Sequence, residues 1–160
     1  MASENKANKS APSGDSVVFL AQTDTTAGFL SSDYRKLNAI KKRDVNQKVL
    51  LTLSDYQNLK ARYRIPRAHR RRVRYARQTS FILPNGKSFR VVKDSRHLAF
   101  LRHFGALYST SANVSGGAFD LAWAMKQADI IVLDSRRIYE AKPSQIIKLS
   151  RKTKIQRKRG

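Results

Sequence analysis

A chain of 160 residues is close to the commonest size of one domain, long enough to bury one core and too short for two. Its 33 Lys and Arg residues against 11 Asp and Glu give a formal net charge of +22, which favours a polyanionic partner such as nucleic acid or a nucleotide. The absence of cysteine excludes disulfides, thiolate chemistry and cysteine-ligated metals. No stretch approaches the roughly 18 apolar residues of a membrane-spanning helix, so we expect a cytoplasmic protein that does not bind a membrane.

The two ends of the chain differ from its centre in composition. Residues 1–16 are rich in Lys, Asn and Ser and lack an apolar run, which predicts a disordered basic and polar tail that is neither a secretory signal nor an anchor. Short apolar clusters recur over residues 17–160, which predicts a single domain with a basic C-terminal end.

The first half of that domain shows alternating strand and helix signals. Short apolar runs predict buried strands over residues 17–21 and 49–53. Between them, Ser32 or Asp33 is the expected N-cap of a helix of about ten residues, and the cations of residues 41–43 stand at its C-terminal end. Such cations either complement the helix dipole or serve a functional site. A short helix is also expected from Ser54-Asp55 to about residue 60.

Residues 60–77 form the most basic segment, with nine Lys or Arg residues and no acid. Pro66 suits the first turn of a helix there, and only a thin apolar stripe that includes Val73 interrupts the charge. The segment is either a solubilising face or a nucleic-acid surface, because arginine binds phosphate through its planar fork. The candidate nucleic-acid-binding residues are Arg67, Arg70, Arg71 and Arg74.

The second half begins with a hairpin signal, since Asn85-Gly86 separates apolar runs at 79–83 and 89–92. Arg90 lies inside the second run, where a charge commonly faces solvent. A helix is expected from Asp94-Ser95 to about residue 104, with its histidines off the apolar stripe and without an assigned role. The residues expected on the buried side of that helix are Leu98, Leu101 and Phe104.

The remaining pattern predicts strands at 106–108, 130–133 and 146–149 and a helix from Asp120, whose side chains Leu121, Trp123, Ala124 and Ala128 can pack. Strands therefore alternate with helices except at the hairpin. This predicts an α+β fold, a three-layer arrangement with a mixed, twisted sheet of about seven strands covered by helices.

Two polar stretches are the candidate site. Residues 109–117 are small and mostly hydroxylated, and residues 22–28 have the same chemistry after an apolar run. Short donors of this kind let a backbone close on an anionic group, so two such loops at strand ends are expected to face one pocket. The alternative is a pair of ordinary polar turns. No nucleophile with a recognisable base and no metal-ligand spacing accompanies them.

Residues 109–116 read Ser-Thr-Ser-Ala-Asn-Val-Ser-Gly and resemble the Ser-x-Ser-Ala-Asn-x-Ser-Gly signature of the YrdC family. Four more segments resemble family motifs in family order, namely those at 23–28, 40–48, 79–84 and 89–91. The resemblance covers residues 17–160 and implies a YrdC-like sheet with an open concave face. The chain resembles the short, single-domain branch of that family.

The resemblance implies an L-threonylcarbamoyladenylate synthase, a nucleotidyltransferase. Such an enzyme converts ATP, L-threonine and bicarbonate into threonylcarbamoyl-AMP and pyrophosphate for N6-threonylcarbamoyladenosine modification of tRNA. Mg²⁺ enters on the ATP phosphates, and tRNA or double-stranded RNA and tRNA-modification proteins are the implied partners. The residues implied to bind the nucleotide or its phosphates are Lys41, Arg43, Lys48, Ser109, Ser111, Asn113 and Arg157. Those implied at the threonine end are Thr23, Thr25, Thr79 and Arg90.

Several loop positions depart from the family pattern. Gln22 and Asp44 stand where the family has proline, and residues 76–78 replace a usual Pro-Gly-Pro. Loss of loop prolines loosens a pocket. Together with the charge, these departures motivate an alternative function, a non-catalytic YrdC-like protein that binds double-stranded or ribosomal RNA. A basic structural protein associated with the ribosome is a second alternative.

Overall fold

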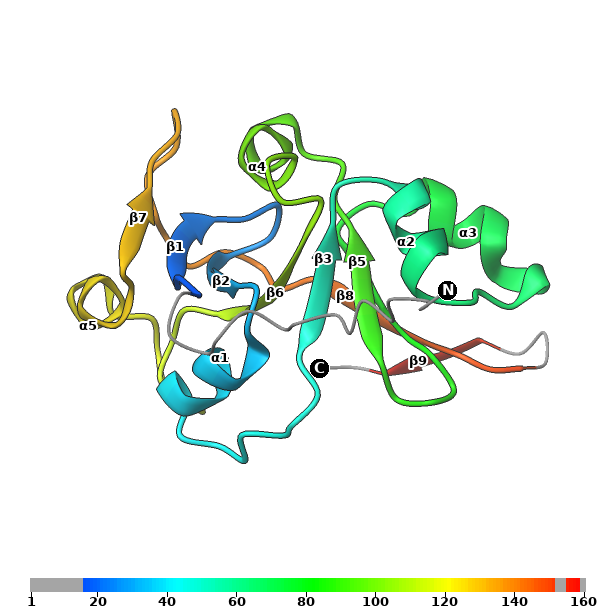
Figure 1. Ribbon diagram of the computed structural model, residues 1–160, viewed down its shortest axis with the longest axis horizontal. Helices are drawn as coiled ribbons and strands as arrows, with labels where there is room; N and C mark the ends of the chain where they lie inside the picture. The colour runs from blue at the N-terminus through cyan, green and yellow to red at the C-terminus, as the bar shows by residue number, and fades with distance from the viewer. Residues whose placement is uncertain (1–15, 152–154, 159–160) are drawn as a thin grey trace, which may run out of the picture.

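The computed structural model describes residues 16–151 and 155–158, and a single mixed sheet runs through them (Figure 1). Nine strands follow one another in the order β7-β1-β2-β6-β3-β5-β4-β8-β9. The strands are β1 (Phe19–Gln22), β2 (Ala27–Ser31), β3 (Leu50–Leu53), β4 (Thr79–Ile82), β5 (Ser88–Val91), β6 (Ala106–Ser111), β7 (Ile130–Val132), β8 (Gln145–Leu149) and β9 (Ile155–Lys158).

Aspartate side chains start four of the helices. The carboxylates of Asp33, Asp55, Asp94 and Asp120 each accept a hydrogen bond from a backbone amide two or three residues further on, which satisfies a donor that the first turn leaves free. The helices are α1 (Tyr34–Ile40), α2 (Tyr56–Arg62), the 3₁₀-helix η1 (Arg67–His69), α3 (Arg70–Tyr75), α4 (Ser95–Leu101) and α5 (Leu121–Gln127).

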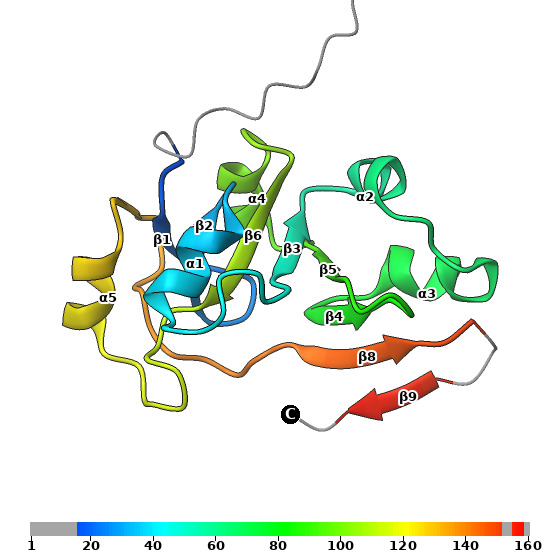
Figure 2. The same ribbon diagram turned by 60° about the horizontal axis from the view of Figure 1, so that its bottom comes forward.

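The strand pairings are mixed in direction. β1 pairs with β7, β3 with β5 and β4 with β8 in parallel, and the other five neighbouring pairs are antiparallel. Figure 1 shows α5 and β7 at one end of the molecule and α2 and α3 at the other, and Figure 2 shows α5 and the α2–α3 pair at the same opposite ends. The fold class expected from the sequence is confirmed, with two more strands than the seven predicted.

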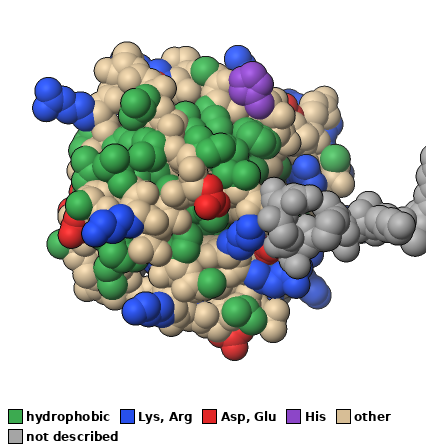
Figure 3. Space-filling view, turned by 60° about the vertical axis from the view of Figure 1, so that its left-hand side comes forward, with side chains coloured by type: hydrophobic (Ala, Val, Ile, Leu, Met, Phe, Trp, Pro, Cys, Tyr) green, Lys and Arg blue, Asp and Glu red, His purple; other side chains and the backbone are tan. Residues whose placement is uncertain are grey.

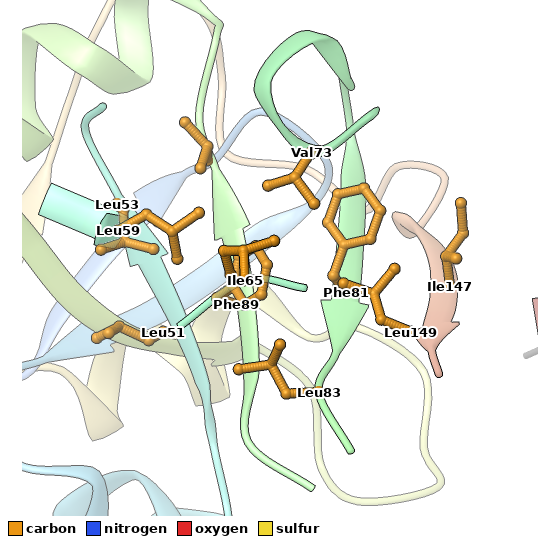
Figure 4. Close-up of a cluster of buried hydrophobic side chains, with 11 residues drawn as sticks. Leu51, Leu53, Leu59, Ile65, Val73, Phe81, Leu83, Phe89, Ile147 and Leu149 are labelled. Carbon is orange, nitrogen blue, oxygen red and sulfur yellow. The ribbon is translucent and has the colours of Figure 1, made fainter. Parts of the chain in front are cut away.

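Alternation along the strands divides the buried side chains between two faces of the sheet. On one face, α2, η1 and α3 cover a cluster that includes Leu51, Phe81 and Phe89 (Figure 4). On the same face, α1 and α5 cover a second cluster around Phe29. The other face is covered by α4, which packs Leu98 and Leu101 on Ala21, Leu30 and Leu107. Because α4 reaches only this part, the strands on the far side of β6 leave that face uncovered.

Two strands, β2 and β9, are additional to those predicted, and β6 is longer than predicted. β2 (Ala27–Ser31) begins within the polar stretch expected at 22–28, and β6 continues to Ser111, so residues 109–111 are strand and not loop. The other additional strand, β9, pairs with β8 beyond the strand expected to be the last long one. The predicted tail at 1–16 lies outside the described residues except for Ser16.

Two side chains expected in the core are exposed. The helix that contains Leu101 ends there, so Phe104 lies beyond it and is 44% exposed while its ring contacts Phe19 and Phe100. Leu121 is the first residue of α5 and is 42% exposed. No described helix is long and apolar enough to cross a membrane.

Candidate active site

A pocket of about 290 Å³ lies on the sheet face that α4 leaves uncovered. Strand alternation explains its lining, because Leu50 of β3 and Arg90 of β5 line the pocket, whereas their neighbours Leu51 and Phe89 point into the core on the other face. On β6, Ser109 stands opposite Leu30 and Ser111 opposite Gly28. The sheet order therefore gathers polar and apolar side chains that are far apart in the sequence around one pocket.

The two polar stretches predicted to face one pocket do line the same pocket. Seven of the predicted ligand-binding residues take part in the lining: Thr23, Thr25, Arg43, Lys48, Arg90, Ser109 and Ser111. Lys41, Asn113 and Thr79 are not among the lining residues, and Arg157 is described by its backbone alone, opposite Ile147 in β9. The ligand-binding roles of all these residues stay predictions.

Lys41 ties the end of α1 to the loop after β6. Its ammonium donates to the carbonyl of Ser111 at 3.0 Å, to Oδ1 of Asn113 at 3.1 Å and to the Asn113 carbonyl. In return, the Ser115 hydroxyl donates to the Lys41 carbonyl at 2.9 Å. Burial, with a smaller contribution from the charge of Arg43, lowers the pKa of Lys41 to about 8. The ammonium thus fixes the loop beside the pocket with all three of its N–H groups.

Arg43 reaches the pocket from a turn that Asn38 shapes. Nε of Arg43 donates to Oδ1 of Asn38 at 2.6 Å, and the Asn38 amide donates to the carbonyls of Val45 and Gln47. Asn38 is fully buried, and no sequence motif marks it as a functional residue. Burial lowers the pKa of Arg43, which stays cationic. Lys48 is exposed and donates to the Asn85 carbonyl of the hairpin turn.

Arg90 forms a buried ion pair at the floor of the pocket. Its Nη2 lies 3.1 Å from Oδ1 of Asp24, and the two side chains are 5% and 2% exposed. Its Nη1 donates to the Ser80 hydroxyl at 3.2 Å. The charge in β5 therefore faces inward and not to solvent. Burial lowers the pKa of Arg90, and the Asp24 carboxylate opposes that effect.

His97 completes the cluster below Arg90. The backbone N–H of Asp24 donates to Nδ1 of His97 at 3.2 Å, and that nitrogen lies 3.5 Å from Oδ1 of Asp24. Burial raises the pKa of Asp24, but His97 and Arg90 outweigh burial and hold it below its usual value. Nε of Arg90 is buried without a hydrogen-bond partner in the described part of the chain, so the guanidinium keeps donor capacity for a bound group.

Three residues that line the pocket or hold it were missed by sequence reasoning. Ser80 takes the place predicted for Thr79, whose hydroxyl instead donates to the Arg77 carbonyl at 2.7 Å. Ser80 Oγ lies 2.8 Å from Ser144 Oγ, which also lines the pocket. Arg136 donates to the carbonyl of Thr23 at 3.2 Å and holds its loop. Of these three residues, Ser80 lies in the 79–84 segment that resembles a family motif.

The site among the described residues is a set of hydroxyls and cations without a cluster of three His, Cys, Asp or Glu side chains able to hold a metal ion. Asn113, predicted to bind nucleotide, closes its own loop by donating to the carbonyls of Val114 and Gly117 and lines a neighbouring cavity of about 190 Å³. The cations and hydroxyls that line the pocket suit an anionic ligand.

The predicted nucleic-acid-binding arginines lie elsewhere. Arg70, Arg71 and Arg74 of α3 line a groove of about 830 Å³ between α2 and α3, and Arg67 is exposed on η1 beside it. The groove shares none of its lining residues with the 290 Å³ pocket.

No protein-family model and no curated protein sequence matches this chain. Three solved structures are similar. E. coli YciO is 18% identical, with a TM-score of 0.67 over 84% of this chain and 78% of YciO. MTH1692 from Methanobacterium thermoautotrophicum is 18% identical, with a TM-score of 0.60 over 82% and 74% of the two chains. P. abyssi Sua5 complexed with L-threonine is 14% identical, with a TM-score of 0.63 over 83% of this chain and 47% of Sua5.

These similarities define the class of protein by its fold. The three structures share a YrdC-like fold, and this chain has a YrdC-like fold as well. It spans about half the length of Sua5, corresponding to 47% of that chain.

Proposed function

We propose that this chain is an L-threonylcarbamoyladenylate synthase that forms threonylcarbamoyl-AMP for tRNA modification. One observation carries the proposal, the convergence of both hydroxyl-rich stretches and of the cations Arg43, Lys48 and Arg90 on one pocket. The likeness of the fold to Sua5, which has been solved complexed with L-threonine, supports it.

The reaction has two bond-forming steps that need alignment and charge neutralisation more than a protein nucleophile. The amine of L-threonine attacks the carbon of bicarbonate, water leaves, and a carbamate forms. A carbamate oxygen then attacks the α-phosphorus of ATP. The bond from that phosphorus to the bridging oxygen breaks, and pyrophosphate leaves with the electron pair. A pocket rich in donors suits both steps.

Arg90 suits the carboxylate of L-threonine. Its guanidinium is buried, it is fixed by Asp24, and its Nε is a donor without a partner among the described residues. A carboxylate placed there gains a charge-assisted hydrogen bond, which is stronger than one between neutral groups. Ser80 and Ser144 supply neighbouring hydroxyls for the polar side chain of the substrate.

Arg43 and Lys48 also line the pocket and suit the phosphates, and Ser109 and Ser111 of the same lining offer hydroxyl donors. In this proposal Mg²⁺ enters as a part of the substrate, bound to the ATP phosphates. A pocket of about 290 Å³ is at the small end for ligand sites, so we expect the adenosine to extend toward its mouth.

The test is pyrophosphate release by the purified chain with ATP, Mg²⁺ and bicarbonate, in the presence and absence of L-threonine. We expect release that depends on threonine and falls at least about tenfold in Arg43→Gln, since one preorganised donor to a developing charge contributes that much or more. Lys42→Gln is the matched control, because the neighbouring cation is exposed and does not line the pocket. A folded protein that releases no pyrophosphate, or releases it without threonine, contradicts the proposal.

A second candidate function is RNA binding without synthesis. Lys41 favours it, because all three ammonium N–H groups already donate to protein acceptors and none is left for phosphate. This candidate predicts RNA binding that weakens with salt and no detectable ATP binding by calorimetry. Threonine-dependent pyrophosphate release excludes it.

A further inference from the structure

We propose that the groove between α2 and α3, here called the arginine groove, binds RNA with unpaired bases. This inference goes beyond the proposed synthase and does not depend on it. Six cations line the groove: Lys60, Arg62, Arg64, Arg70, Arg71 and Arg74.

None of these six cations forms an ion pair with a carboxylate in the described part of the chain. All six are exposed, and among the described residues only Arg70 makes a side-chain hydrogen bond, from Nε to the Ile65 carbonyl at 3.2 Å. Like charges held in one concavity repel one another and focus a positive potential on it. A polyanion that enters the groove removes this repulsion, and the planar forks of the five arginines match phosphate geometry.

Tyrosine rings lie among the cations of the groove. They favour an RNA with unpaired bases over other polyanions. The guanidinium of Arg74 lies 4.9 Å from the ring centroid of Tyr56, and Lys60 Nζ lies 5.8 Å from the same centroid. Tyr75 lines the groove while 69% exposed. Exposed aromatic faces beside cations stack on bases, which a paired duplex hides and a single strand presents. An acidic protein segment would satisfy the charges and leave these rings unused.

The groove and the active-site pocket lie on opposite faces of the sheet. Helices α2 and α3 pack on Leu51 and Phe89, whose neighbours Leu50 and Arg90 line the pocket on the other face. Figure 3 shows the end of the molecule that is distant from α2 and α3. Hydrophobic side chains gather there, and Lys and Arg are scattered. RNA in the groove therefore leaves the pocket open.

The test uses the full chain and a fluorescein-labelled unstructured RNA of twelve nucleotides, with anisotropy measured from 50 to 300 mM salt. Each phosphate contact to a single strand contributes about 0.7 to the slope of log affinity against log salt. Changing Arg70, Arg71 and Arg74 together to Gln is expected to lower that slope by about 2 and the affinity at 100 mM salt at least about tenfold. The matched control removes the same charge from exposed residues outside the groove, Arg102, Lys126 and Arg137.

Variants of Tyr75 distinguish the contribution of base stacking to RNA binding from that of charge. Tyr75→Ala is expected to weaken binding about tenfold, whereas Tyr75→Phe keeps the ring and the affinity. The same RNA annealed to its complement is expected to bind more weakly and to be insensitive to Tyr75→Ala. Equal losses in the groove and control variants overturn the proposal, and so does equal binding of single strand, duplex and a polyaspartate. Pyrophosphate release by the groove variant reports on the synthase separately.

Discussion

Replacing Asp24 with Asn leaves the buried charge of Arg90 without a counter-charge, and we expect this change to destabilise the fold strongly. The two side chains are 2% and 5% exposed, and the ion-pair atoms are 3.1 Å apart. Removing one partner of a buried pair costs about 3–5 kcal/mol. The matched control is Asp134→Asn, which removes a more exposed carboxylate 2.6 Å from Arg136 and costs at most about 1 kcal/mol.

The assay is urea unfolding at neutral pH. With an m-value of about 2 kcal/mol per molar, the Asp24→Asn midpoint falls by about 1.5–2.5 M and the Asp134→Asn midpoint by less than about 0.5 M. Arg90→Met in the Asp24→Asn background is expected to recover part of the loss, because it removes the stranded charge. Equal midpoints for the two single variants would refute the reasoning.

The same pair predicts a pH dependence. The pKa of Asp24 is below its usual value of 3.8 in the folded chain, so the unfolded state binds the proton first as pH falls. The stability that this carboxylate contributes is present above pH 3.8 and is lost as pH falls through the lower folded pKa. Asp24→Asn is expected to remove this part of the acid sensitivity, measured as a shallower fall of the unfolding free energy below about pH 4.

Three further changes test other parts of the molecule. ATP affinity is expected to fall between pH 7 and pH 9, because Lys41, with a pKa of about 8, loses a proton and with it one of the hydrogen bonds that hold the loop beside the pocket; calorimetry that finds the same fall in Lys41→Met refutes this. Gly28→Ala places a methyl group 2.9 Å from Thr23 Cγ2, so overpacking is expected to cost about 1–3 kcal/mol, and an unchanged Tm contradicts it. Phe89→Ala empties a fully buried site and is expected to cost about 3–5 kcal/mol in urea unfolding, whereas a loss below about 1 kcal/mol contradicts it.

Local chemistry explains which elements the sequence predicts well. Capping aspartates such as Asp33 and Asp94 fix helix starts within one turn, since the carboxylate bonds to amides two or three residues away. Asn85-Gly86 predicts the β4–β5 hairpin because Gly86 adopts a φ of +82°, which glycine tolerates without strain. These signals need no knowledge of the rest of the chain.

Long-range pairing explains what the sequence does not predict. Every residue of β2 is buried, so the strand shows no alternation, and its Gly28 and Ser31 favour a loop assignment. His97 meets Asp24 across 73 residues, and no local pattern marks that contact. Thr79 was assigned to the site from its motif, yet Ser80 lines the pocket, because a shift of one residue along a strand moves a side chain to the opposite face.

The same strand alternation joins the pocket to the core beneath the arginine groove. Phe89 packs under α2 and α3 while the next residue, Arg90, reaches the pocket, so the two faces share one backbone segment. The pocket and the arginine groove therefore lie on opposite faces of one sheet and share no lining residue. The charges of the groove lie on exposed helices, whereas those of the pocket are buried or held by hydrogen bonds. Added salt is therefore expected to weaken anion binding in the groove far more than anion binding in the pocket.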